Sequence, residues 1–187
     1  MFQNISPRVS SVLAIIGGVL MVDQLTKFLA IVYLQPRRSI PVFGDFLRLT
    51  YVENPGMAFG IELENKFLFN LLSLLAVGLI LVYLFKLRDH VLLRTAFAVI
   101  LGGAFGNLLD RFLYGRVVDF VDVEFFDLHF SGGTLLFWNL PEYSLYRWPV
   151  FNMADVAVTV GMLLVIWSAF FYNPSRVAVE HAVREEI

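Results

Sequence analysis

The sequence predicts a mainly α-helical membrane protein with four transmembrane helices and a small β-rich cap on the outer side of the membrane. Of its 187 residues, 58% are hydrophobic and 16% are charged, and the mean hydropathy is +0.73. Soluble globular domains contain roughly 25% charged residues. The chain is too poor in ions and too rich in apolar residues for that class, which indicates a protein that lies in a bilayer.

Four apolar stretches are long enough to cross a hydrocarbon core, which requires roughly 20 helical residues. The first stretch continues without a small-residue cleavage site, so we expect a span rather than a cleavable signal peptide. The expected spans are about 11–34, 67–86, 92–113 and 151–172. We expect one membrane domain over 1–174, with outer loops at 35–66 and 114–150 and a cytoplasmic tail at 175–187.

The connection between the second and third spans sets the expected orientation. It is short and holds Lys86, Arg88 and Arg94. Cytoplasmic loops carry an excess of Lys and Arg, and long loops count for less, so we expect this loop and both termini in the cytoplasm. Asp119 then follows the third span and Asp155 begins the fourth at the same outer face, where the two carboxylates can meet.

Both outer loops show signs of structure. Residues 44–56 alternate apolar and polar side chains and end in a Pro-Gly turn, a pattern typical of a strand. The 120–150 loop is rich in Phe, Trp and Tyr, with turn signals at 131–133 and 140–143. Aromatic side chains favour the bilayer interface, so we expect this loop to rest on the membrane surface.

Two polar motifs occur near the first span. Asp23 and Lys27 are four apart and therefore share a helix face. An ionisable residue at mid-bilayer costs about 2.5–3.5 kcal/mol and usually has a function, although the pair could simply hold helices together. In the NPG turn, Asn54 offers a donor and an acceptor and Gly56 allows a close backbone approach; an ordinary turn is the alternative.

The third span ends in the letters GGAFGNLLDR. Gly102 and Gly106 are four apart, which suits close helix packing in membranes. Packing does not explain Asn107, Asp110 and Arg111, which bring an amide and two opposite charges to the end of the span. The adjacent Asp110 and Arg111 point in different directions and need separate partners.

Asp119 and Asp155 each have a structural interpretation when taken alone. Asn152 is a good helix N-cap, and Asp155 three residues later completes a capping-box pattern. Asp119 could be a surface carboxylate near Arg116. Taken together, the two aspartates favour a functional interpretation over a structural one, because several other polar residues gather at the same end of the spans.

Two neighbouring aspartates suit peptide hydrolysis, which requires a base to activate water and an acid to protonate the leaving amine. Two close carboxylates share one proton and so supply both roles without a metal. The sequence has no cysteine, no HExxH and no G-x-S-x-G motif. A serine–lysine arrangement with Lys27 remains formally possible, but Ser10 and Ser11 lie toward the opposite end of that span.

The sequence resembles the bacterial lipoprotein signal peptidases, the signal peptidase II family, in four blocks. These are DQLTK (23–27), NPGMAFG (54–60), GGAFGNLLDR (102–111) and the pair VVDF and FNMAD (117–120 and 151–155). The resemblance implies an intramembrane aspartic endopeptidase of the bacterial inner membrane. Such an enzyme removes signal peptides from diacylglyceryl-modified prolipoproteins, cleaving just before the lipidated cysteine.

Carried over by residue, the resemblance places the catalytic pair on Asp119 and Asp155. It implies that a set of polar residues orients this pair and binds substrate: Asp23, Lys27, Asn54, Gly56, Asn107, Asp110, Arg111 and Asn152. It also implies membrane lipids as partners, inhibition by cyclic peptide antibiotics, and no metal or organic cofactor. The net charge of −2 gives no support for nucleic-acid binding.

One stretch departs from the family pattern. The connection between Asp119 and Asp155 is long and contains an aromatic insert at 129–148, which we expect to form one wall of a lipid-binding cleft. Two other classes remain as alternatives. A proton-coupled transporter would also carry intramembrane charges but would usually show repeat symmetry and broken helices; a structural subunit would need no clustered charges.

Overall fold

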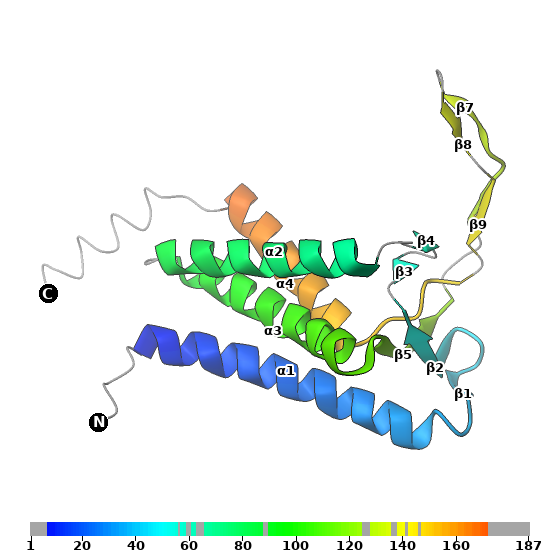
Figure 1. The fold of residues 1–187 in the computed structure, drawn as a ribbon, viewed down its shortest axis with the longest axis horizontal. Helices are drawn as coiled ribbons and strands as arrows, with labels where there is room; N and C mark the ends of the chain where they lie inside the picture. Colours follow the sequence, from blue (N-terminus) through cyan, green and yellow to red (C-terminus); the bar gives the residue numbers. More distant parts are fainter. Residues whose placement is uncertain are drawn as a thin grey trace, which may run out of the picture.

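Four helices run side by side and meet a cap of β-strands at one end in the computed structural model (Figure 1). The structure describes residues 7–55, 57–58, 61–62, 66–87, 90–124, 128–135, 138–140, 142–145 and 147–171. The helices are α1 (Pro7–Tyr33), α2 (Lys66–Lys86), α3 (Val91–Tyr114) and α4 (Met153–Phe171). The predicted class, a mainly helical membrane protein with a small β-rich cap, is confirmed.

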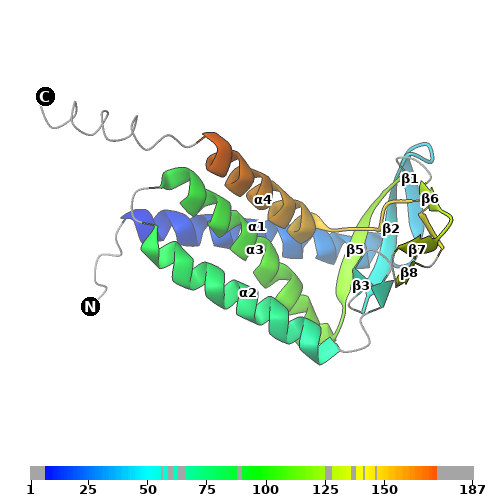
Figure 2. The same cartoon turned by 90° about the horizontal axis from the view of Figure 1, so that it is seen from above.

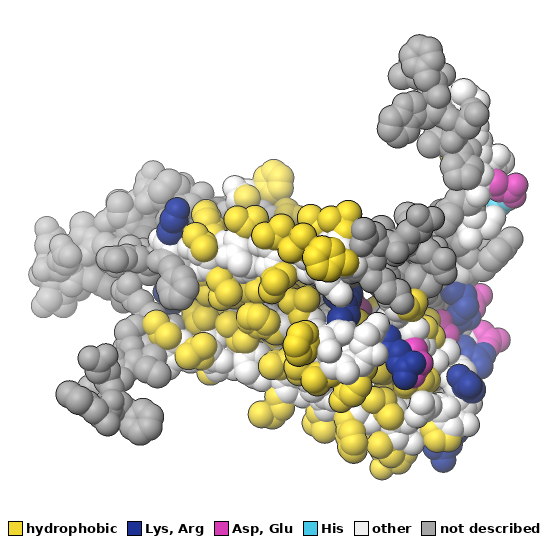
Figure 3. Space-filling model, viewed as in Figure 1, with side chains coloured by type: hydrophobic (Ala, Val, Ile, Leu, Met, Phe, Trp, Pro, Cys, Tyr) yellow, Lys and Arg dark blue, Asp and Glu magenta, His cyan; other side chains and the backbone are white. Residues whose placement is uncertain are grey.

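Within the described residues, three helices are long and apolar enough to cross a membrane: Val9–Tyr33, Val91–Tyr114 and Met153–Phe171. Helix α2 contributes a shorter apolar stretch, Asn70–Leu84, so a fourth span stays a prediction. Large apolar side chains lie exposed along the helices, and the charged side chains on this face gather mainly over the cap (Figure 3). This distribution matches helices surrounded by lipid and a cap in contact with water.

Helix α3 lies at the centre of the bundle and packs against each of the other three helices (Figure 2). Glycines allow the close approach: a Cβ added at Gly102 would come 2.6 Å from Cβ of Val19 on α1. Gly103 faces the backbone of Ala154 on α4 in the same way. The predicted packing role of Gly102 is confirmed, as expected where helices associate without a hydrophobic driving force.

The main sheet of the cap is antiparallel, with the strand order β1–β2–β5. Its strands are β1 (Ser39–Phe43), β2 (Leu47–Asn54) and β5 (Val117–Val123). Strand β2 is the strand predicted within 44–56. At the end of α3, Gly115 adopts a left-handed conformation with φ of 70°, which a glycine tolerates without strain, and the chain turns directly into β5.

A small core holds the sheet on the end of α1. It contains the buried residues Ala30, Leu34, Tyr51, Val118 and Phe120. Because residues of one strand alternate between its two faces, packing Val118 and Phe120 against α1 fixes the direction in which Asp119 points. The core of the cap therefore positions one of the two predicted catalytic carboxylates.

The long connection after β5 forms a hairpin that extends away from the sheet, crosswise to the helices (Figure 1). Strand β6 (Leu128–Phe130) pairs with β9 (Tyr143–Leu145), and β7 (Gly133–Leu135) pairs with β8 (Trp138–Leu140). A separate short pair, β3 (Met57–Ala58) and β4 (Ile61–Glu62), precedes α2. Contact of the hairpin with the membrane surface stays a prediction.

Candidate active site

Strand β5 carries Asp119 into the interior between the cap and the helices. The Asp119 side chain is only 3% exposed, and its Cα pairs in register with Val52 of β2. Asn54, the last residue of β2, donates from Nδ2 to Oδ2 of Asp119 at 3.0 Å. The sheet register therefore brings two residues from distant sequence motifs into contact.

The segment before α4 is held against β5 by backbone hydrogen bonds. Phe151 and Val121 form an isolated antiparallel bridge, and the amides of Phe120 and Val121 both donate to the Phe151 carbonyl oxygen. Asn152 follows directly and is completely buried. Its Nδ2 donates to Oδ1 of Asp119 at 2.7 Å. The start of α4 is thus fixed in register with the strand that carries Asp119.

Asn152 and Asp155 form the capping box that the sequence predicts. The Asn152 amide donates to Oδ2 of Asp155 at 3.1 Å, and the Asp155 amide donates to Oδ1 of Asn152 at 3.1 Å. A reciprocal pair of this kind satisfies two otherwise unpaired donors at a helix start. The structural interpretation is confirmed, yet it does not exclude chemistry, because Asn152 uses its remaining amide hydrogens on Asp119 and Asn107.

Asn107 of α3 completes a chain of hydrogen bonds between the two aspartates. Its Nδ2 donates to Oδ1 of Asp155 at 2.8 Å. Its Oδ1 accepts from Nδ2 of Asn152 at 3.1 Å and from Nζ of Lys27 at 2.9 Å. Asp119, Asn152, Asn107 and Asp155 are therefore linked in sequence, and two amide side chains set the positions of two carboxylates.

Lys27 lies beneath this chain in a buried charge cluster between α1 and α3. Its Nζ is 2.9 Å from Oδ2 of Asp23 and 2.9 Å from Oδ2 of Asp110. The side chains of the three residues are at most 4% exposed. Burial of charges is costly unless they are paired and hydrogen-bonded, and each charge here has an opposite partner.

Gln24 belongs to the same cluster, although its sequence position did not single it out. Its Nε2 donates to Oδ2 of Asp23 at 3.1 Å, to Oδ1 of Asp110 at 3.0 Å and to the Gly106 carbonyl oxygen at 3.4 Å. Adjacent helical residues do not usually face each other, so the spacing rule that selects Asp23 and Lys27 passes over Gln24. A polar residue inside an apolar span is the one signal that could have identified it.

The charge cluster also holds the backbone of the site. The Ala154 amide in the first turn of α4 donates to Oδ1 of Asp23 at 2.9 Å. The Val118 amide, next to Asp119, donates to Oδ2 of Asp110 at 3.4 Å. Gly106 lies against the Asp23 carboxylate, where an added Cβ would come 2.9 Å from Cγ. Helix packing therefore explains Gly102 but not Gly106, which leaves room for Asp23.

The environment of Asp119 favours its protonated form. The pKa of the Asp119 carboxyl is raised from 3.8 to about 7, mainly by burial and also by the nearby charge of Asp155. Hydrogen bonds from Asn54 and Asn152 and the charge of Lys27 act in the opposite direction. The half-buried Arg111 also acts electrostatically on Asp155 and Asp119. Near neutral pH, one member of the pair can therefore hold a proton.

The structure rejects two of the alternative interpretations. Asp119 is not a surface carboxylate beside Arg116, because it is buried and Arg116 pairs instead with Glu53 at 2.8 Å. Ser11 lies sixteen positions before Lys27 on α1, about 24 Å away along a helix. Of the predicted site residues, Gly56 lies outside the described residues. Arg88 of the predicted cytoplasmic loop and all of the predicted tail also lie outside them.

Among the residues that the structure describes, no group of three or more His, Asp or Glu is placed to hold a metal ion. The fold and the site together define a membrane protein with a buried pair of aspartates that amide side chains hold in place. Two cationic residues, Lys27 on α1 and Arg111 on α3, act electrostatically on Asp119. Comparisons with known proteins extend this description.

The sequence matches the profile of the family described as signal peptidase (SPase) II over residues 15–171. A lipoprotein signal peptidase of Caldanaerobacter subterraneus subsp. tengcongensis is 40% identical over 165 residues, which is 88% of this chain and 99% of the relative. One of Moorella thermoacetica is 38% identical over 150 residues, covering 80% of this chain and 85% of the relative. A solved structure of a bacterial membrane enzyme superposes with a TM-score of 0.66 at 28% identity, covering 88% of this chain and 96% of that one.

The chain belongs to the signal peptidase II family. It is accordingly a peptidase of the aspartic type that lies in a membrane, and the predicted resemblance to this family is confirmed.

Proposed function

We propose that this peptidase removes signal peptides from diacylglyceryl-modified prolipoproteins and cleaves just before the lipidated cysteine, with Asp119 and Asp155 as its catalytic pair. The relatives are named lipoprotein signal peptidases, which supports the substrate class. The observation that carries the proposal is the continuous chain of hydrogen bonds from Asp119 through Asn152 and Asn107 to Asp155.

In the proposed mechanism, Asp155 is the general base and Asp119 the general acid. Asp155 removes a proton from water, which attacks the scissile carbonyl. Asp119, whose pKa is raised to about 7 by burial, protonates the leaving amine. General acid–base catalysis of this kind contributes about 10²–10⁴-fold each time a side chain is correctly placed. The reaction needs neither a metal nor an organic cofactor.

The remaining predicted residues have supporting roles in this proposal. Asn107 and Asn152 orient the pair directly, and Asn54 fixes Asp119 from the side of the sheet. The buried charge cluster of Asp23, Lys27 and Asp110 holds the start of α4 and the start of β5 by hydrogen bonds to their backbone amides. Arg111 and Gly56 are assigned to substrate binding.

The proposal includes a location and an orientation. The protein would lie in the bacterial inner membrane as a four-span domain over residues 1–174, with both termini and the 175–187 tail in the cytoplasm. The start of α1 and the end of α4 lie at the same end of the bundle, opposite the cap (Figure 1), which supports this arrangement. Substrate would enter laterally from the bilayer, membrane lipids would contact the site, and cyclic peptide antibiotics would compete with substrate.

A gel-shift assay with a diacylglyceryl-modified prolipoprotein tests the proposal. The protein in lipid or detergent is compared with Asp119→Asn and Asp155→Asn, and with Asp45→Asn as a control at a carboxylate that is 82% exposed on the same cap. We expect cleavage by the parent protein and the control, and loss of cleavage in both site variants. Robust cleavage by either site variant would reject the catalytic pair, and an inactive, well-folded parent would reject the proposed substrate.

A further inference from the structure

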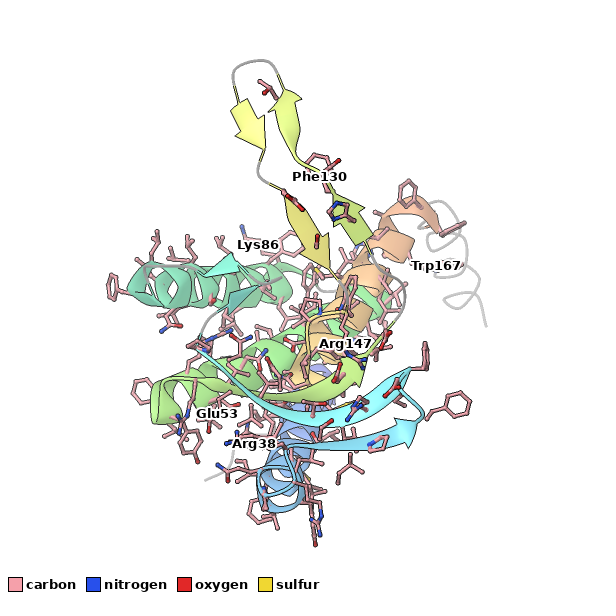
Figure 4. All side chains as sticks on the ribbon, turned by 90° about the vertical axis from the view of Figure 1, so that its right-hand side faces the viewer. Arg38, Glu53, Lys86, Phe130, Arg147 and Trp167 are labelled. Carbon is pink, nitrogen blue, oxygen red and sulfur yellow. The ribbon has the colours of Figure 1, made fainter. Side chains whose placement is uncertain are left out.

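The hairpin inserted after β5 leaves and rejoins the cap at two residues that contact each other. The chain departs after Glu124 and returns at Arg147, whose guanidinium pairs with the Glu124 carboxylate through Nη1. Nε of Arg147 donates to Oδ1 of Asp122 at 2.8 Å, and Nη2 donates to the Asp45 carbonyl oxygen at 3.0 Å. One side chain therefore closes the base of the insert and joins it to the β1–β2 turn. Figure 4 shows Arg147 between the sheet and the hairpin.

Asp122 is the central partner in this arrangement. Its side chain is 9% exposed, and its second oxygen, Oδ2, accepts from the Thr50 hydroxyl at 2.7 Å. Asp122 and Asp119 are three positions apart on β5, so they point to opposite faces of the strand. Asp122 therefore lies on the face of β5 that also carries Val118 and Phe120, opposite the face that carries Asp119.

The segment that begins at Arg147 runs along β5 to the site. The Trp148 amide donates to the Val123 carbonyl oxygen at 3.0 Å, and Phe151 exchanges hydrogen bonds with Val121. The next residue, Asn152, contacts Asp119. Arg147 lies at the outer end of this short backbone ladder, and the catalytic pair lies at its inner end.

We propose that Arg147 is a positioning residue for the peptidase: its bond to Asp122 keeps residues 147–151 aligned with β5 and so holds Asn152 and Asp155 opposite Asp119. This inference rests on the proposed function of Asp119 and Asp155. The ladder has few bonds, and the hairpin of β6 to β9 extends from its open end. Without the Arg147 clamp, movement of the hairpin would pass directly along the segment into the start of α4.

Arg147 lies outside the group of charges that acts on Asp119. The charged groups that act on Asp119 are Asp155 on α4, Arg111 on α3 and Lys27 on α1. The charged partners of Arg147 are Asp122, Glu124 and Asp45. A change at Arg147 therefore reaches Asp119 through altered alignment and hydration, and not through direct loss of a neighbouring charge.

Kinetics of Arg147→Met and Arg147→Lys in the prolipoprotein cleavage assay test the proposal. Rates are expressed per folded molecule, from circular dichroism and monodisperse elution. Arg48→Gln is the matched control, since Arg48 makes an ion pair with Asp45 on the same sheet and is not bonded to residues 147–151. A misplacement of about 1 Å can cost 100-fold in rate, so we expect kcat of Arg147→Met to fall between about 10- and 100-fold, with KM nearly unchanged.

The pH profile separates positioning from simple stabilisation. If the segment loosens, water reaches Asp119, and the fall in kcat at high pH moves to lower pH. Arg147→Lys, which keeps one charged bond to Asp122, should restore part of kcat and part of the profile, and Arg48→Gln should retain the parent values. The inference would be overturned if Arg147→Met lost folded protein but kept the parent kcat and pH profile per folded molecule. It would also be overturned if Arg147→Met matched the parent in every measurement. An inactive parent protein would instead reject the proposed function itself.

Discussion

The side-chain amide of Asn152 bonds to Oδ1 of Asp119 at 2.7 Å while its side-chain oxygen caps helix α4 by accepting from the Asp155 amide. One residue therefore performs a task common to many helices and a task specific to this site. The two tasks use different atoms, Nδ2 and Oδ1, and can be separated by substitution.

Asn152→Ser should separate them. Serine is as good an N-cap as asparagine, so we expect Asn152→Ser to keep the cap and to lose only the stability of the two missing side-chain bonds, about 1–3 kcal/mol. The serine hydroxyl is too short to bridge Asp119 and Asn107, and we expect kcat to fall by at least about 100-fold. Asn152→Ala is the comparison: it should lose activity equally and an additional ~1 kcal/mol of stability. Full activity of the serine variant would show that the bridge is not needed.

Activity should decline as pH rises through the pKa of Asp119, about 7. If the pair needs one proton, kcat falls about tenfold per pH unit once both carboxylates are ionised. Initial rates of prolipoprotein cleavage between pH 5 and 9 would measure this limb. A rate that stays constant up to pH 9 would contradict the assignment of Asp119 as the proton donor.

The stability of the folded protein should also depend on pH through Asp119, and it should fall as the pH rises. The folded pKa of Asp119, about 7, lies above its ordinary value of 3.8. The folded state therefore binds more protons than the unfolded state between these values, and stability falls as pH rises from about 4 to 7. Asp119→Asn removes this loss, up to about 4 kcal/mol. Thermal unfolding of both proteins at pH 5 and pH 8 should show the variant gaining relative stability at pH 8.

Gly106→Ala should damage the site through Asp23. An added methyl would overlap the Asp23 carboxylate, which in turn holds the Ala154 amide and Lys27. Overpacking of this kind costs about 1–3 kcal/mol, and we expect reduced cleavage as well. Gly78→Ala on α2 is the matched control, because nothing lies within 4 Å of its added Cβ. Equal behaviour of the two variants would show that the Gly106 contact is unimportant.

Gln24 offers a test of the buried charge cluster. Gln24→Glu would replace the donor to Asp23 and Asp110 with a third carboxylate, and burial of an unpaired charge is strongly destabilising. Gln24→Met should cost less, about 1–3 kcal/mol, because it only leaves polar atoms without a donor. We expect the midpoint of thermal unfolding to be highest for the parent, lower for Gln24→Met and lowest for Gln24→Glu. A glutamate variant as stable as the parent would contradict this account of the cluster.

Replacing residues 125–146 by an Asn-Gly turn tests the predicted lipid-cleft role of the insert. Glu124 and Arg147 already contact each other, and a two-residue turn suits such adjacent strands, so we expect the shortened protein to fold. If the aromatic insert forms one wall of the cleft, KM should rise several-fold while kcat stays near that of the parent. Unchanged turnover and unchanged substrate affinity would refute the role.

Sequence patterns predicted the parts of the site that depend on local spacing or on span count. Asp23 and Lys27 share a helix face because they are four apart, and the capping box at 152–155 is a local motif. The count of spans placed Asp119 and Asp155 at one end of the bundle. Each of these inferences needs only one segment or the order of the segments.

Contacts that join separate segments of the helix bundle or of the cap were not predictable in this way. The bonds of Gln24 to Asp110 and of Arg147 to Asp122 depend on the angle between helices and on the register of β5. Gly106 followed the pattern of a packing glycine, and only the position of Asp23 shows why a side chain is excluded there. Three-dimensional register, and not residue type, distinguishes these residues from their neighbours.

Helix α4 is the last of the four helices to be synthesised, and it brings both Asn152 and Asp155 to the site. Until it docks, a growing chain has Asp119 on its strand but lacks the second carboxylate and the amide that aligns the pair. If Asp119 and Asp155 are the catalytic pair, the order of the helices along the chain delays peptidase activity until α4 has docked.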